Sequence, residues 1–157
     1  MPPSIEQILK GVRIAEVKRH QSCCVGPETP LEEVYRRLDE QRPGAVVVRD
    51  GDRVTGIFTE RDVLYRTALE QPDPATPIGE LATREPVTMR PDQRLAEAIE
   101  TMASKGYRHL PLVDADGREA GLLSSRDILA FIAEHVPESV LNLPPKLHQT
   151  MTSPEGG

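Results

Sequence analysis

The sequence contains no tryptophan, and aromatic residues make up only 3% of its 157 residues. Apolar residues nevertheless reach 38%, which suits one compact domain or two small lobes sharing an aliphatic core. No apolar run approaches the roughly 20 residues that cross a bilayer. The N-terminus also lacks the charged and apolar stretches of a secretory signal. Neither a membrane span nor a secretory signal is therefore expected.

An excess of positive charge is missing as well. Lys and Arg number 19 against 25 Asp and Glu, which gives a formal net charge of -6 at pH 7. Proteins that bind a nucleic-acid backbone usually present a basic face. The charge balance therefore argues against a nucleic-acid partner.

Cysteine is scarce, since the adjacent Cys23 and Cys24 are the only two. Neighbouring residues on a strand point to opposite faces, so a disulfide between them would be strained. No His or further Cys lies beside them at metal-ligand spacing, and we interpret them as small buried strand residues. Two thiols without a disulfide framework predict a cytoplasmic protein.

The most informative feature present is an internal repeat. Three segments recur in the same order, with one extra residue in the second copy: Ile14–Val17 with Ile78–Leu81, Ala45–Val48 with Leu110–Val113, and Gly56–Leu64 with Gly121–Leu129. We divide the chain into an N-terminal segment (1–13), a first copy (14–70), a Pro-rich linker (71–77), a second copy (78–136) and an extended C-terminal tail (137–157).

Each copy is predicted to form a βαββα unit, which makes the fold α/β (α+β). Helical spacing of apolar residues predicts helices from Leu31 to about Glu40 and from Leu95 to about Lys105. The other predicted elements are strands at 23–25, 45–48, 87–89 and 110–113, third strands ending at Phe58 and Leu123, and closing helices over 60–69 and 125–133. Ser4 is expected to cap a short N-terminal helix, and Thr29 to open a capping box with Pro30 at the first helical position. One unit cannot bury both faces of its sheet, so we expect the copies to pack sheet to sheet.

Both copies resemble CBS (cystathionine-β-synthase) domains, and together they resemble a stand-alone CBS pair. The second copy matches in Leu110–Val113, the Asp116-Gly117 turn, Gly121–Ser124 and Asp127, and the first copy matches at the equivalent positions. The resemblance implies a pseudo-two-fold pair with two clefts that often bind AMP, ADP, ATP or S-adenosylmethionine. It implies no required cofactor and, in many members, a homodimer that regulates another protein.

Two Ser/Thr-x-x-Asp motifs, Thr59 with Asp62 and Ser124 with Asp127, allow two interpretations. A hydroxyl at the helix start and an acid three residues later form a capping box. The same helix start, with free N–H groups and a carboxylate, also suits a phosphate and a ribose diol. In the family the Asp holds the ribose, so the resemblance implies ligand binding beside capping.

The resemblance adds Arg108, His109 and Pro111 to the candidate ligand-binding residues. Arg or His at the first two positions often faces phosphates in nucleotide-binding relatives, and a guanidinium supplies a fixed charge. The first copy carries Pro43 and Gly44 there, so we expect two unequal clefts, with Arg42 as a conceivable substitute. Arg61 and Arg126 precede the aspartates and are interpreted as surface or dimer-contact residues.

No catalytic pattern stands out, because the four histidines are scattered and no nucleophile–base pair, metal-ligand set or Gly-rich loop is present. We therefore expect no enzyme and no metal. The first hypothesis is a regulatory, adenosine-sensing homodimer, and the alternative is a structural or protein-interaction module with vestigial clefts. Apolar residues on several sides of the closing helices favour an isologous dimer.

Overall fold

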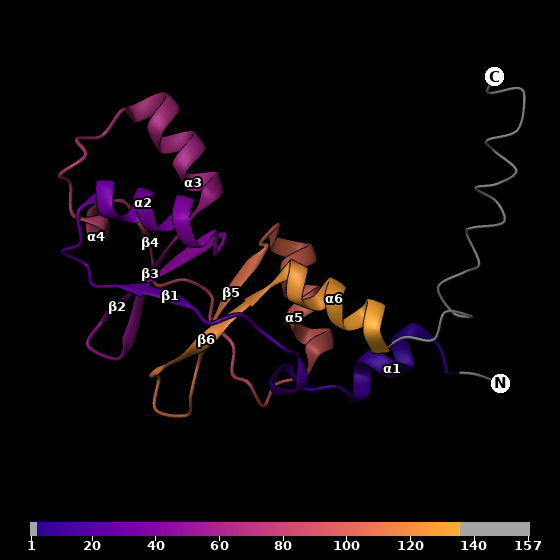
Figure 1. Ribbon diagram of the computed structural model, residues 1–157. Helices are drawn as coiled ribbons and strands as arrows, with labels where there is room; N and C mark the ends of the chain where they lie inside the picture. The colour runs from indigo at the N-terminus through magenta and orange to yellow at the C-terminus, as the bar shows by residue number, and fades with distance from the viewer. Residues whose placement is uncertain (1–2, 136–157) are drawn as a thin grey trace, which may run out of the picture.

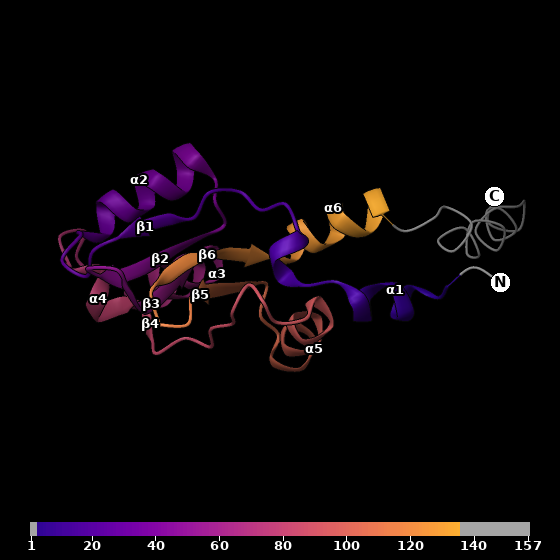
Figure 2. The same cartoon turned by 90° about the horizontal axis from the view of Figure 1, so that it is seen from below.

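The computed structural model describes residues 3–135, and the predicted tail (137–157) lies outside them. Two lobes lie side by side, each with a small sheet and its own helices (Figure 1; Figure 2). The elements in chain order are α1 (Ile5–Gly11), the 3-10 turn η1 (Ile14–Glu16), β1 (Cys23–Val25), α2 (Leu31–Gln41), β2 (Ala45–Asp50), β3 (Arg53–Thr59), α3 (Glu60–Tyr65), the π-helical turn η2 (Arg66–Glu70), α4 (Ile78–Leu81), β4 (Thr83–Arg84), α5 (Leu95–Lys105), β5 (His109–Val113), β6 (Glu119–Ser124) and α6 (Ser125–His135).

The helix starts follow the sequence patterns with one exception. Ser4 caps α1 with a complete capping box, as predicted. The capping box predicted at Thr29 is wrong, because Pro30 itself is the N-cap of α2 and no side chain caps that helix. The linker takes over this role: the carbonyls of Thr76 and Pro74 accept the N–H groups of Leu31 and Glu32, each at 2.9 Å. Backbone acceptors from a distant segment thus satisfy the first helical donors.

The first lobe contains a four-stranded sheet in the order β1-β2-β3-β4. β1 runs parallel to β2, whereas β3 is antiparallel to both β2 and β4. The fourth strand, Thr83–Arg84, comes from the beginning of the second copy and pairs with Gly56 and Ile57. The first sheet is therefore completed by the second copy.

The second lobe has only the antiparallel pair β5 and β6. The strand predicted at 87–89 is reduced to one bridge between Met89 and Leu112. Met89 donates to the carbonyl of Pro111 at 3.1 Å, so the backbone polar groups of residue 111 face this segment. Proline has no N–H to offer the carbonyl of Val87, which explains why the pairing stops.

The hydrophobic cores cross the boundary between the copies. Ile14 and Val17, from the start of the first copy, are buried in the cluster formed by α5, β5, β6 and α6. Ile78 and Leu81, from the start of the second copy, are buried in the cluster formed by α2, β2 and β3. Each lobe thus needs a segment of the other copy to close its core. A third cluster, Ala45, Val47, Ile57 and Leu122, joins the two lobes through their sheets.

The closing helices leave several large apolar side chains in solvent. Leu64, Leu69 and Leu129 are 70%, 77% and 68% exposed. α3 ends after Tyr65 and continues as the π-helical turn η2, so the helix predicted over 60–69 is present but irregular. No helix within residues 3–135 is long and apolar enough to cross a membrane.

Candidate functional site

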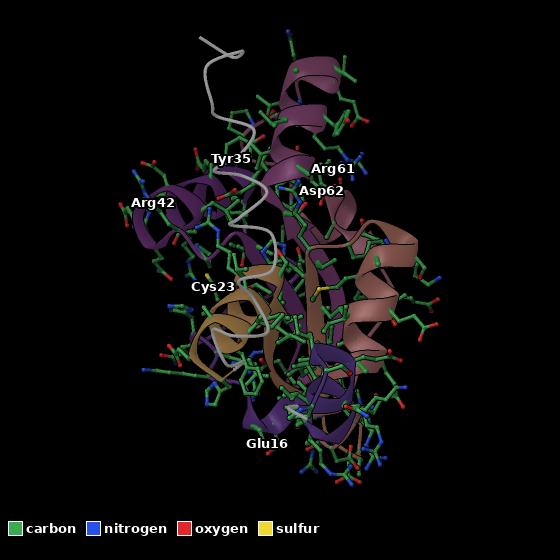
Figure 3. The ribbon with its side chains drawn as sticks, turned by 90° about the vertical axis from the view of Figure 1, so that its right-hand side faces the viewer. Glu16, Cys23, Tyr35, Arg42, Arg61 and Asp62 are labelled. Carbon is green, nitrogen blue, oxygen red and sulfur yellow. The ribbon has the colours of Figure 1, made fainter. Side chains whose placement is uncertain are left out.

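The start of α3 is a complete capping box. Thr59 accepts from the N–H of Asp62 at 3.3 Å, and the Asp62 carboxylate accepts from the N–H of Thr59 at 2.9 Å. The same carboxylate oxygen also accepts from the Thr59 hydroxyl at 3.1 Å. Arg61 and Asp62 lie together at this helix start (Figure 3), with the Arg61 guanidinium 5.6 Å from the Tyr65 ring centroid. The structure therefore confirms the capping box that the sequence pattern predicts at Thr59 and Asp62.

The start of α6 repeats this arrangement in a more buried setting. Ser124 accepts from the N–H of Asp127 at 3.1 Å, and Asp127 Oδ2 accepts from the N–H of Ser124 at 2.9 Å. Asp127 is 6% exposed, and among residues 3–135 it is the one charged residue that the fold buries. Its second oxygen, Oδ1, lies 3.3 Å from Nδ1 of His20, a residue of the first copy. One carboxylate oxygen of Asp127 thus caps its own helix, and the second oxygen faces the first copy.

Three further candidate residues lie next to this helix start. The carbonyl of Arg108 accepts the N–H of Ser125 at 2.9 Å, and His109 pairs with Ser124 across the β5–β6 ladder. Arg108 is exposed, whereas His109 is half-buried. Pro111 is buried inside the sheet and meets Met89, so the structure places it in the strand pairing rather than beside Asp127. Arg108, His109, Ser124 and Asp127 therefore form one cluster, which we call the Asp127 site.

Gly44 and His109 meet where the two copies touch, a contact that the sequence interpretation missed. Gly44 has a φ of 81°, and a Cβ added there would lie 2.6 Å from His109 Nε2. The missing side chain in the first copy therefore makes room for the imidazole of the second. Burial lowers the pKa of His109, while the carboxylates of Glu60 and Asp127 partly offset that effect. In the ladders, Ala45 holds the position of His109, so the first copy has no imidazole there. That the two clefts differ in the ligand they hold stays a prediction.

The other arginines considered in the sequence lie at the surface. Arg42 ends α2 with a left-handed φ of 50°, and Figure 3 shows it at that helix end while Arg61 and Asp62 lie at the start of α3. Arg126 is exposed on the first turn of α6. No contact of Arg42 with Asp62 occurs in the described part of the chain, so nothing in the fold makes Arg42 a substitute for Arg108.

Both cysteines are free thiols, as predicted. Cys23 is buried in the first core, and Cys24 is half-buried on the other face of β1. Burial raises the pKa of each thiol. Between residues 3 and 135, no group of three or more His, Cys, Asp or Glu side chains is placed to hold a metal ion.

The chain matches known proteins over most of its length. The family model of the CBS domain matches twice, at residues 14–68 and 78–134. An uncharacterized protein of Methanopyrus kandleri is 32% identical over 123 residues, which is 77% of this chain and 63% of the relative. The chain thus spans less than two thirds of that relative.

Solved structures agree with the fold. A CBS domain protein from Pyrobaculum aerophilum complexed with AMP is 25% identical, with a TM-score of 0.69 over 83% of this chain and 95% of that one. The CBS domain pair of protein MJ0100, in complex with 5'-methylthioadenosine and S-adenosyl-L-methionine, is 19% identical with a TM-score of 0.70, over 77% of this chain and 99% of that one. Two family matches in tandem, on two lobes of the fold that these structures share, show that the chain belongs to the CBS-domain family as a pair of CBS domains.

Proposed function

We propose that this CBS pair is a regulatory module that senses an adenosine derivative, AMP, ADP, ATP or S-adenosylmethionine, at the Asp127 site. The observation that carries the proposal is Asp127 itself. A carboxylate that is 6% exposed is costly to bury, and capping satisfies only Oδ2 with a backbone donor. Oδ1 faces the first copy, where a ribose diol would supply two hydroxyl donors.

The groups around Asp127 suit the rest of such a ligand. Arg108 is exposed beside the start of α6, where the helix dipole and a guanidinium both favour a phosphate. His20 occupies the space near Oδ1, but its side chain is 97% exposed and free to turn away. The Pyrobaculum relative, complexed with AMP, supports the adenosine class.

The second half of the proposal is a homodimer formed through the closing helices. Leu64, Leu69 and Leu129 stay exposed in the single chain, and an isologous contact would cover the same patch on both copies. Light scattering at micromolar concentration should therefore show a dimer. A monomer would refute this part and leave the ligand proposal untouched.

The matched pair Asp127→Asn and Asp62→Asn tests the ligand site. Hydrogen bonds to a charged acceptor contribute roughly 1.5–3 kcal/mol, so Asp127→Asn should weaken AMP and adenosine binding about ten- to a hundredfold. Asp62→Asn removes the same charge from the start of α3, where the carboxylate is only half-buried, and its effect on AMP should be smaller. Isothermal titration calorimetry measures both affinities, and urea unfolding measures the cost to stability.

The alternative is a structural or protein-interaction module whose aspartates only cap helices. The capping boxes at both helix starts favour it. In that case no adenine nucleotide or S-adenosylmethionine at millimolar concentration would raise the melting temperature, since only a ligand that binds the folded state stabilises it. Equal, near-zero losses of affinity in the two mutants, with AMP binding intact, would remove both aspartates from the ligand site.

A further inference from the structure

The first closing helix buries less of itself in its own lobe than the second closing helix does. Neither α3 nor η2 contains a buried residue, whereas α6 buries Asp127, Ile128 and Phe131. The position of Phe131 is taken in the first copy by Arg66, which pairs with Glu70 at 2.9 Å. α3 and η2 therefore add little to their own core and leave large apolar side chains uncovered.

These uncovered side chains lie along one face of the helix. Leu64, Tyr65 and Leu69 are 70%, 55% and 77% exposed, and Ala68 between them is exposed as well. Residues four apart share one side of a helix, and the i→i+5 turn of η2 keeps Leu69 on the side of Leu64. We call this surface (Leu64, Tyr65, Ala68 and Leu69) the α3 ridge.

The same face of α6 carries smaller side chains. Its equivalent residues, in the same order, are Leu129, Ala130, Ala133 and Glu134. Leu129 is 68% exposed, and the three residues that follow it on this face are exposed too. Only Leu129 is both large and apolar, so this surface, which we call the α6 flat, projects less than the ridge.

The ridge and the flat of one subunit lie apart from each other. Figure 1 shows α3 and α6 leading away from the boundary between the lobes in opposite directions. One subunit therefore cannot cover its own ridge with its own flat. A second subunit can, because a two-fold axis near the boundary between the lobes brings the flat of each subunit to the ridge of the other.

Within the dimer proposed above, on which this inference rests, we propose a crossed arrangement, in which the α3 ridge of each subunit packs on the α6 flat of the other. Two-fold symmetry makes the two helix contacts of a crossed dimer identical, so one fit of large against small side chains serves both. Packed helices lie about 8–10 Å apart, depending on the side chains between them. A matched dimer, which pairs like lobes, would combine a contact of two ridges with a contact of two flats, and these require different separations.

The crossed arrangement joins unlike lobes across the dimer. α6 begins at the Asp127 site and carries the flat, so the helix that bears this site contacts the first lobe of the other subunit. A ligand bound at Asp127 would therefore act on a contact between a second lobe and a first lobe.

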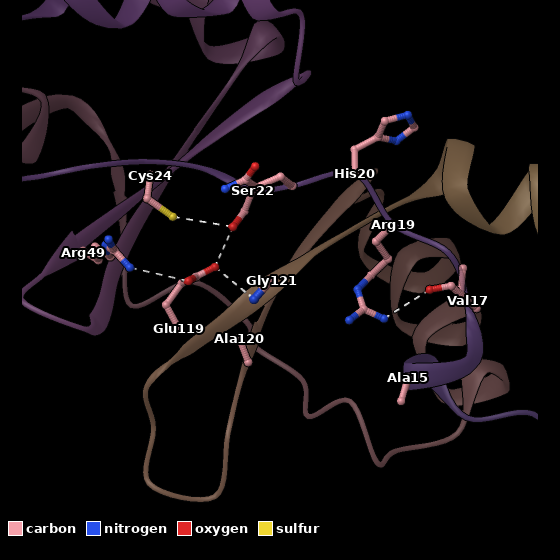
Figure 4. A pocket seen from close by; sticks show the side chains of 11 residues that line it. Ala15, Val17, Arg19, His20, Ser22, Cys24, Arg49, Glu119, Ala120 and Gly121 are labelled. Carbon is pink, nitrogen blue, oxygen red and sulfur yellow. Dashed lines mark hydrogen bonds and ion pairs between the residues drawn. The ribbon is translucent and has the colours of Figure 1, made fainter.

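Cross-linking of single cysteines tests the arrangement in the full chain. Both native cysteines are first replaced by alanine, since neither lies on a closing helix: Cys24 lines a pocket of about 700 Å³ between the copies, with Glu119 in its floor (Figure 4). Leu64→Cys and Leu129→Cys then carry one thiol each. A short bismaleimide should join the two variants after their subunits have exchanged, and it should join neither variant to itself.

Side-chain size gives a second test, which uses the natural cysteines and carries the test if the alanine background fails to fold. Ala133→Leu adds volume to the flat, where the ridge already packs in a crossed dimer, so the dissociation constant should rise about tenfold or more. A matched dimer would tighten instead, because the leucine fills the gap between two flats. Ala103→Leu is the matched control, because Ala103 is exposed on α5. Sedimentation velocity over a dilution series measures both constants.

The crossed arrangement is overturned if either cysteine variant is joined to itself, or if Ala133→Leu leaves the dissociation constant unchanged or lowers it. An equal effect of Ala103→Leu overturns it as well. A natural chain that stays monomeric refutes the dimer and this arrangement together, whereas a dimer with any of the other results refutes the arrangement alone.

Discussion

The two copies keep the same helix starts and differ in the strands that lead to them. Both helices open with a hydroxyl and an acid that cap each other. At equivalent ladder positions, the strands before them carry Ala45 and Val47 in the first copy and His109 and Pro111 in the second. These differences lie in strands that contact the other copy. The two copies therefore share the local capping interactions and differ in the contacts that they make with each other.

The neighbours of each aspartate show the same inequality. Asp127 is buried and faces His20 of the first copy, whereas Asp62 is only half-buried. The segment that contains His20 makes no strand with β6, while its equivalent, Thr83–Arg84, joins β3. One duplicated segment thus closes a sheet edge in one lobe and opens a pocket in the other.

The largest expected effect tests the difference between the copies that proline at position 111 creates. Val47→Pro should reproduce in the first copy what Pro111 does in the second, because Val47 holds the same ladder position as Pro111 and its N–H faces β1. A buried carbonyl left without its donor costs about 1–3 kcal/mol, so the free energy of unfolding in urea should fall by that amount. Pro111→Val is the converse and should protect a new amide at residue 111 from hydrogen exchange. Unchanged stability of Val47→Pro would contradict the role assigned to proline.

The next largest expected effect is the loss of stability on substituting the glycine at position 44. Gly44→Ala forces an alanine into the left-handed region, which costs about 1–2 kcal/mol, and pushes its Cβ against His109. Gly51→Ala is a matched control, because Gly51 has a φ of 63° with no atom within 4 Å of the added Cβ. We expect Gly44→Ala to be the more destabilising in urea unfolding. The difference should vanish in a His109→Ala background, and its persistence there would show that the imidazole is not the obstacle.

The smallest expected effect is on the pH dependence of the free energy of unfolding, and it comes from His109. Its pKa is lowered in the folded protein, mainly by burial, so the unfolded chain binds the proton more readily. The contribution to stability is complete above the ordinary pKa of about 6.5 and is lost as the pH falls through that value. His109→Asn should flatten the loss between about pH 8 and pH 5. The same substitution at His20, whose side chain is 97% exposed, is the control, and an equal flattening there would contradict this assignment.

Short-range patterns in the sequence were enough to predict the βαββα repeat, most helix and strand positions and the two capping boxes. These features depend on residues a few positions apart, such as Ser124 and Asp127, whose geometry the local backbone sets. The same local information failed at Thr29 and at the strand predicted over 87–89. There, the outcome depended on linker carbonyls and on the missing N–H of Pro111.

The tertiary structure alone decided how the copies use each other. Ile14 and Ile78 complete each other's cores, Gly44 makes room for His109, and Arg19 and Arg49 converge on the pocket floored by Glu119. Each of these contacts joins residues far apart in the chain. Periodicity and spacing report which face of an element is apolar, but they carry no information on which distant segment covers that face. Folding makes that choice through packing, which is why the repeat was visible in the sequence and its asymmetry was visible only in space.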